Sequence, residues 1–183
     1  MWPWHIKFQR VSFAPAFCQS GKSVLANFVS ESVEGIGSYS PTQGVRILEY
    51  EKPNLNGNSK GAGCRIELWD CSGDQKFETC WPALMKDSHG VMIIFNPELP
   101  SHLKEIEMWY SCFVQQQPLL DSQCLLVAHH KPGSAGDTEN LSLGKKMENS
   151  ICNSEAFIDL HTCKIVHSLY LIYCKIICGC LYK

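Results

Sequence analysis

Short apolar runs alternate along the chain with stretches in which apolar side chains recur every three or four residues. Residues 90–95 (GVMIIF) and 123–128 (QCLLVA) are continuous apolar runs, which is typical of strands buried on both faces of a largely parallel sheet. Residues 45–50 and 64–69 are two more strand candidates, and the Asn-, Gly- and Ser-rich residues 54–63 between them predict a hairpin loop. The pattern therefore predicts a mostly parallel sheet that also contains one hairpin.

Two segments have the periodicity of helices. Residues 22–30 form one candidate, and residues 101–116 form the other, with Ser101 as the predicted N-cap. In the second segment the apolar positions follow helical spacing: Leu103, Ile106, Trp109, Tyr110 and Phe113. Strands that alternate with helices predict an α/β fold with a mostly parallel central sheet flanked by helices, and with its functional site at the carboxyl ends of the strands.

Length and composition favour one globular domain. The chain has 183 residues, of which 45% are hydrophobic and 19% charged, and its formal net charge of -2 gives no basis for nucleic-acid binding. We assign residues 1–168 to the domain and residues 169–183 to a divergent apolar tail. The apolar region at residues 165–183 contains Lys175 and is short for a membrane span. Three residues follow the pair Cys178 and Cys180, a poor match to Rab prenylation, so no direct membrane anchor is expected.

The eleven cysteines do not predict a disulfide framework or a metal site. Their number is odd and no Cys-x-x-Cys pair occurs. Several of them lie within or beside apolar runs, where a free cysteine behaves as a small hydrophobic side chain: Cys71, Cys80, Cys112 and Cys124. A reduced intracellular protein is therefore expected.

Residues 16–23 (AFCQSGKS) fit a phosphate-binding loop, except that Ala16 stands where glycine is expected. In such a loop, backbone N–H groups and the N-terminus of the next helix bind phosphate oxygens. Lys22 would reach the β- and γ-phosphates, and the Ser23 hydroxyl would ligate Mg²⁺. The predicted nucleotide-binding residues of this segment are Ala16, Phe17, Cys18, Gln19, Ser20, Gly21, Lys22 and Ser23. Taken alone, a lysine in an ordinary exposed turn explains the same pattern.

Two later motifs reduce that ambiguity. Asp70 and Gly73 belong to a Trp-Asp-x-x-Gly sequence directly after a predicted strand. There, Asp70 would hold the Mg²⁺ shell through water, and the Gly73 N–H would meet a γ-phosphate oxygen. Thr42, in the loop before the hairpin, would close onto Mg²⁺ and the γ-phosphate. The predicted metal-site residues are thus Ser23, Thr42 and Asp70. A P-loop kinase of small metabolites lacks support, because it does not explain Thr42 together with the Trp-Asp-x-x-Gly sequence.

The segment expected to bind the nucleobase departs from the usual Asn-Lys-x-Asp motif. Lys131 occupies the lysine position and could cover the base with its stem, while His130 stands in place of the asparagine. Gly133 replaces the aspartate that would accept hydrogen bonds from guanine. Poorer discrimination between GTP and ATP is therefore expected.

Residues 20–133 closely resemble the Rab-like 5 family of the Ras-like small GTPase superfamily. The matching segments include SGKSVLANF, YSPTQGVRILE, ELWDCSGDQKFE, CWPALMKD, MWYSCFVQQ and AHHKPGS, and they extend over roughly two-thirds of the chain. The resemblance implies a P-loop NTPase fold of the Ras type that binds GTP or GDP with Mg²⁺. It also implies membership of the intraflagellar transport B complex, contacts with its coiled-coil subunits, and a role in cilium assembly. The expected location is the cytoplasm, the cilium and the ciliary base.

Two functions remain open at this point. The first is a GTP-binding regulatory subunit of the transport complex. The second is a pseudo-GTPase adaptor that binds its partners without nucleotide, which the altered residues Ala16, His130 and Gly133 favour. Enzymatic activity would at most be slow GTP hydrolysis, because Asp74 follows Gly73 where a Ras-like protein has its catalytic glutamine.

Overall fold

Six strands form one sheet in the order β2-β3-β1-β4-β5-β6. The computed structural model describes residues 7–13, 20–30, 41–52, 64–120, 123–129 and 157–160. The strands are β1 (Lys7–Phe13), β2 (Val45–Lys52), β3 (Cys64–Cys71), β4 (Gly90–Phe95), β5 (Cys124–His129) and β6 (Phe157–Leu160). Strand β2 runs antiparallel to β3, and every other neighbouring pair is parallel. The mostly parallel sheet and the hairpin are therefore both confirmed.

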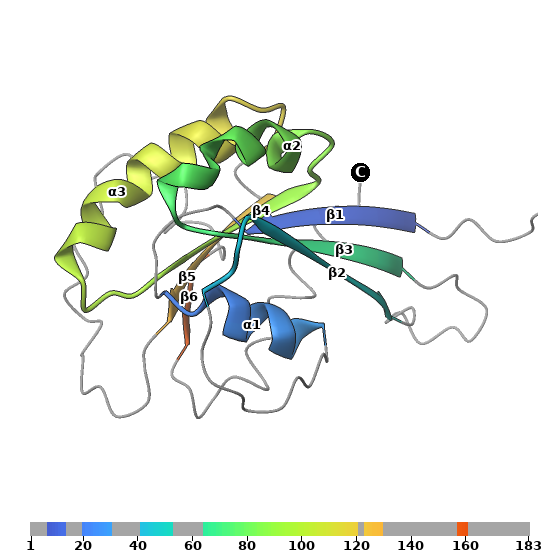
Figure 1. Ribbon diagram of the computed structural model, residues 1–183, viewed down its shortest axis with the longest axis horizontal. Coiled ribbons are helices and arrows are strands. Elements are labelled where there is room, and N and C mark those ends of the chain that lie inside the picture. Colours follow the sequence, from blue (N-terminus) through green and yellow to red (C-terminus); the bar gives the residue numbers. More distant parts are fainter. Residues whose placement is uncertain are drawn as a thin grey trace, which may run out of the picture.

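Helices cover both faces of this sheet (Figure 1). Helix α1 (Lys22–Val29) lies on one face, and α2 (Trp81–Met85) and α3 (Pro100–Tyr110) lie on the other. Two short segments complete the second layer: the 3-10 helix η1 (Gln75–Cys80) before α2 and the π-helical turn η2 (Ser111–Gln115) after α3. Strands β4 and β5 are buried along their whole length, as their continuous apolar runs predict.

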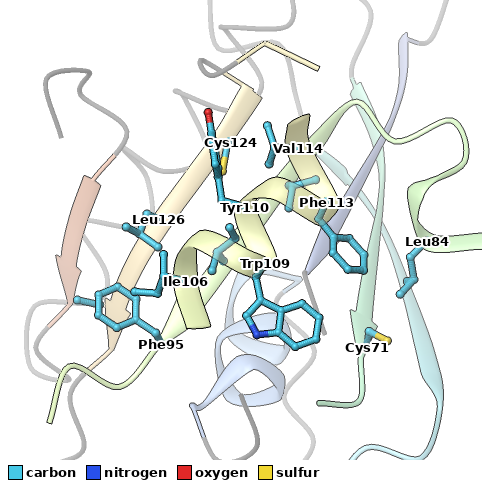
Figure 2. Close-up of a cluster of buried hydrophobic side chains, with 13 residues drawn as sticks. Cys71, Leu84, Phe95, Ile106, Trp109, Tyr110, Phe113, Val114, Cys124 and Leu126 are labelled. Atoms are coloured by element: carbon cyan, nitrogen blue, oxygen red, sulfur yellow. The ribbon is translucent and has the colours of Figure 1, made fainter. Parts of the chain in front are cut away.

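Aromatic side chains fill the core between the sheet and α3. Trp109 and Phe113 project from α3 and η2 towards the sheet (Figure 2). The Trp81 ring packs edge-on against both, with its centroid 5.1 Å from Trp109 and 5.9 Å from Phe113. This edge-to-face geometry is favourable because it places ring edges against ring faces. These ring contacts hold α2, which follows Asp70 in the chain, against α3 and η2 on the same face of the sheet.

The start of α3 differs from the prediction. The N-cap is Leu99 and not Ser101, and Pro100 is the first helical residue. Proline favours this position because its fixed φ suits a helix and its missing N–H would have no partner there. The amphipathic pattern itself is confirmed, since Ile106, Trp109 and Tyr110 are buried.

Strand β1 is central although its sequence is polar. Arg10 lies opposite Glu67 of β3, and its Nε donates to Glu67 Oε2 at 3.3 Å. The guanidinium stacks over the Trp69 ring, 4.4 Å from its centroid, and Nη1 donates to the Lys86 carbonyl at 2.9 Å. Each of these contacts compensates for placing a charge in the middle of the sheet.

The described residues contain no helix that is both long and apolar enough to cross a membrane. The predicted tail at residues 169–183 and the boundary after residue 168 lie outside the described residues. The division into a domain and a tail thus stays a prediction.

The Arg10–Glu67 pair gives a test of this packing. Replacing Arg10→Leu should lower the free energy of unfolding by about 1–3 kcal/mol, because Glu67 then stays partly buried without its counter-charge and keeps only the hydrogen bond from Trp69 Nε1. The double variant Arg10→Leu/Glu67→Leu should recover most of this loss. Chemical denaturation of the wild type, Arg10→Leu, Glu67→Leu and the double variant measures both effects, and strictly additive losses would contradict the arrangement.

Candidate nucleotide-binding site

Three predicted site residues meet at the carboxyl ends of the central strands. Ser23 is the second residue of α1, Thr42 lies just before β2, and Asp70 lies near the end of β3. The Ser23 and Thr42 hydroxyl oxygens are 2.6 Å apart, and Thr42 Oγ1 donates to Asp70 Oδ2 at 3.4 Å. Asp70 is completely buried. Residues separated by up to 47 positions (70 − 23) therefore form one polar cluster.

The N-terminus of α1 suits an anion. Gly21 is the N-cap with φ 88°, and no side chain caps the helix. The first turn contains no acidic residue, so its N–H groups and the positive end of the helix dipole are available to a phosphate. Lys22 is only 6% exposed, and its Nζ lies 3.5 Å from Ser20 Oγ. Its charge therefore lies inside the site and not in solvent.

The oxygen cluster fits Mg²⁺. At Mg–O distances of 2.0–2.1 Å, two ligands at right angles lie about 3 Å apart, which is close to the 2.6 Å between the Ser23 and Thr42 hydroxyls. Asp70 Oδ1 is buried and accepts no hydrogen bond within the described part of the chain. A buried oxygen of this kind costs free energy unless it gains a partner, and a water on the metal would provide one.

Arg46 is a member of the cluster that sequence reasoning missed. It lies in β2 directly opposite Asp70 in β3. Its Nη2 donates to Asp70 Oδ2 at 3.0 Å and to the Ser23 carbonyl at 3.4 Å. The hairpin register contained the signal, because a residue paired with Asp70 must lie beside this predicted metal-site carboxylate.

His129 is a second residue that was missed. It ends β5, and its Nδ1 lies 2.9 Å from the Ser20 carbonyl oxygen. The imidazole also packs against Gly21 so closely that a Cβ at position 21 would overlap it. In the sequence, the sign of such a residue was the adjacent pair His129 and His130 at the end of a predicted strand. The predicted residues His130 and Lys131, like Ala16, Phe17, Cys18 and Gln19, lie outside the described residues.

Comparison with known proteins decides the family. The model of the Roc domain (Ras of Complex, Roc, domain of DAPkinase) matches residues 18–131. The chain is 71% identical over 126 residues to the intraflagellar transport protein 22 homologue of Rattus norvegicus, covering 69% of this chain and 68% of that protein. The chain belongs to the family of intraflagellar transport protein 22 homologues. The relative from Danio rerio is 58% identical over 142 residues, covering 77% of this chain and 75% of that protein.

Two solved crystal structures from T. brucei share the fold of this chain. The GTP-bound IFT22/74/81 crystal structure superposes with a TM-score of 0.64 at 20% identity, covering 94% of this chain and 99% of that one. The GDP-bound IFT22 crystal structure gives a TM-score of 0.60 at 21% identity, covering 94% and 98%. The Roc model and the curated relatives confirm the resemblance to the Ras-like superfamily, and the Ras-like G-domain fold is confirmed as well.

In this intraflagellar transport 22 family member, Asp74 has a local structural role. It is the N-cap of η1, where its carboxylate accepts from the Lys76 N–H at 3.1 Å and pairs with Lys76 Nζ at 2.9 Å. These hydrogen bonds from Lys76 lower the pKa of the Asp74 carboxyl, so it is a poor base. Gly73 precedes Asp74 in the chain, and its predicted contact with a γ-phosphate stays a prediction. Gln75, the neighbouring glutamine, is exposed.

Burial around the site also controls its thiol chemistry. Cys71 follows Asp70 and is fully buried. Burial raises the pKa of the Cys71 thiol to about 12, and the nearby Lys22 cation opposes this only in part. The thiol therefore stays protonated and acts as a small core side chain, as expected from the sequence.

Two glycines allow a matched test of the His129 contact. Gly44 also has a positive φ of 67°, but a Cβ there would lie 3.8 Å from Phe77, an ordinary contact. Gly44→Ala should therefore cost about 1–2 kcal/mol of backbone strain, whereas Gly21→Ala should cost about 1–3 kcal/mol more because of the overlap.

Urea denaturation measures the difference between the two variants. Adding His129→Ala to Gly21→Ala should restore part of the lost stability. Equal losses for Gly21→Ala and Gly44→Ala would show that His129 does not pack on the loop.

Proposed function

We propose that the chain is a GTP-binding, Rab-like subunit of the intraflagellar transport B complex that acts in cilium assembly and intraciliary transport. Its proposed locations are the cytoplasm, the cilium and the ciliary base. The observation that carries the nucleotide part is the convergence of Ser23, Thr42 and buried Asp70 beside the uncapped start of α1. The family supports the transport part, because its members are named for intraflagellar transport.

Each residue of the cluster has a proposed task in binding GTP or GDP. Lys22 and the α1 N–H groups neutralise the phosphates. The Ser23 and Thr42 hydroxyls would hold Mg²⁺, with Asp70 accepting from its waters, and the bound metal would supply charge neutralisation between the phosphate oxygens. The T. brucei relatives are described as GTP-bound and GDP-bound, which supports a guanine nucleotide over other ligands.

The proposed partners are coiled-coil subunits of the B complex. The T. brucei structure named IFT22/74/81 supports such a complex, because it contains the relative together with two further transport proteins. Affinity purification of the tagged chain from ciliated cells tests this part. Recovery of the B-complex subunits is the expected result, and a purified fraction without them would contradict the assignment.

A nucleotide-independent adaptor is the second candidate. Two observations favour it: Asp74 is engaged in capping η1, and Arg46 already neutralises Asp70. The two functions differ in whether partner binding requires bound nucleotide, and a Lys22 variant tests this difference. If the chain is an adaptor, Lys22→Ala will leave its recovery of transport subunits unchanged.

Nucleotide binding should depend on Lys22. Replacing Lys22→Ala removes the buried cation of the loop, so the affinity for mant-GTP should fall about 10-fold or more, the scale of a charge-assisted hydrogen bond. Lys104→Ala is the control, because Lys104 is exposed on α3. Fluorescence titration in Mg²⁺ buffer gives both values, and equal affinities for wild type and Lys22→Ala would argue against a functional phosphate loop.

Intrinsic hydrolysis of GTP should be very slow. We expect a single-turnover rate below about 10⁻⁴ s⁻¹, because Asp74 cannot orient the attacking water as a glutamine does. Asp74→Gln should raise this rate. Asp74→Asn is the matched control, since it removes the charge and keeps the cap without the longer reach. A rate typical of glutamine-bearing GTPases, unchanged in Asp74→Gln, would show that position 74 is not the catalytic position.

A further inference from the structure

Arg46 lies in the site although it belongs to none of the nucleotide-binding motifs predicted from the sequence. Its guanidinium lies between two structural elements, with one nitrogen 3.0 Å from Asp70 Oδ2 on β3 and 3.4 Å from the Ser23 carbonyl at the start of α1. The same Asp70 oxygen accepts from Thr42 at 3.4 Å. The arginine therefore contacts the cluster that we propose as the Mg²⁺ site.

The burial of this pair distinguishes it from an ordinary surface ion pair. The Asp70 side chain is 0% exposed and that of Arg46 is 29% exposed. A carboxylate removed from water is strongly destabilised unless a positive charge or several hydrogen bonds compensate for it. Arg46 supplies a positive charge and one hydrogen bond, from the position directly opposite Asp70 in the hairpin.

A second arginine pair joins the same two strands and provides a comparison. Arg65 on β3 pairs with Glu49 on β2, but these side chains are 50% and 49% exposed. Exposed pairs contribute little, because water already solvates both charges. The two arginines therefore link the same hairpin in the same chemical way, and only Arg46 lies at the nucleotide site.

We propose that Arg46 is an intrinsic counter-ion that replaces Mg²⁺ at Asp70 and thereby makes nucleotide binding less dependent on the metal. The proposal rests on the proposed function, since it concerns how that site treats its ion. In the metal-free site, Arg46 neutralises the buried carboxylate and holds Asp70, Ser23 and β2 together. When Mg²⁺ enters, the arginine opposes it, because it occupies an Asp70 oxygen and is a like charge close by.

Removal of the arginine should therefore weaken nucleotide binding mainly in the metal-free state. Without Arg46, the metal-free site has a buried, uncompensated carboxylate and loses affinity for nucleotide. With Mg²⁺ present, the metal itself compensates Asp70, so the affinity changes little. The ratio between the dissociation constants without and with Mg²⁺ is the quantity that reports this effect.

The experiment is a fluorescence titration with mant-GDP in excess Mg²⁺ and in EDTA. The proteins are the wild type, Arg46→Ala, Arg46→Gln and the matched control Arg65→Ala. The ratio of dissociation constants, EDTA over Mg²⁺, should rise about tenfold in Arg46→Ala, the effect of one charge-assisted hydrogen bond. Arg46→Gln keeps a hydrogen-bond donor without the charge and should show a similar rise, whereas Arg65→Ala should keep the wild-type ratio.

Each other outcome identifies which statement fails. An unchanged ratio in both Arg46 variants, or equal weakening in both buffers, overturns the counter-ion proposal and leaves the nucleotide site intact. A wild type that binds mant-GDP in neither buffer overturns the proposed function and this inference with it. If Arg46→Ala does not fold, the ratio in Arg46→Gln decides alone.

Discussion

The buried carboxylate of Asp70 is the constraint on which the site depends. It lies at 0% exposure at the end of β3 and must be compensated by charge or hydrogen bonds. Thr42 and Arg46 provide this compensation in the structure described here. Because they come from the segment before β2 and from β2 itself, satisfying Asp70 also fixes where that strand and the start of α1 lie.

The sheet order explains how so few residues produce this arrangement. Strands β1, β3 and β4 are parallel neighbours, so the segments that follow them emerge at one edge of the sheet. A backbone hydrogen bond joins two of these segments at the same edge, since the Ser72 N–H after β3 donates to the Gly44 carbonyl before β2 at 2.8 Å. The polar cluster is thus a consequence of topology, because β3 carries Asp70, α1 carries Ser23, and the short segment before β2 carries Thr42.

The sequence predicted the elements better than the contacts between them. Period and composition identified β4, β5 and the hairpin, because burial on both faces and turn residues leave clear patterns. Ser23, Thr42 and Asp70 could be predicted as site residues because their motifs are local, and the structure places their side chains together. The roles of Arg46 and His129 depend on strand pairing across the sheet, which no local motif contains. Ser101 was predicted as a cap because its side chain is favourable, but Pro100 determined where the helix begins.

A crystal structure with a non-hydrolysable GTP analogue and Mn²⁺ is the most direct test of the central claim, that the Asp70 cluster is the metal and phosphate site. Mn²⁺ takes the oxygen ligands of Mg²⁺ and is visible by anomalous scattering. We predict one anomalous peak between the Ser23 and Thr42 hydroxyls, with the phosphates at the start of α1. A nucleotide bound elsewhere, or a metal without either hydroxyl as ligand, would contradict the account.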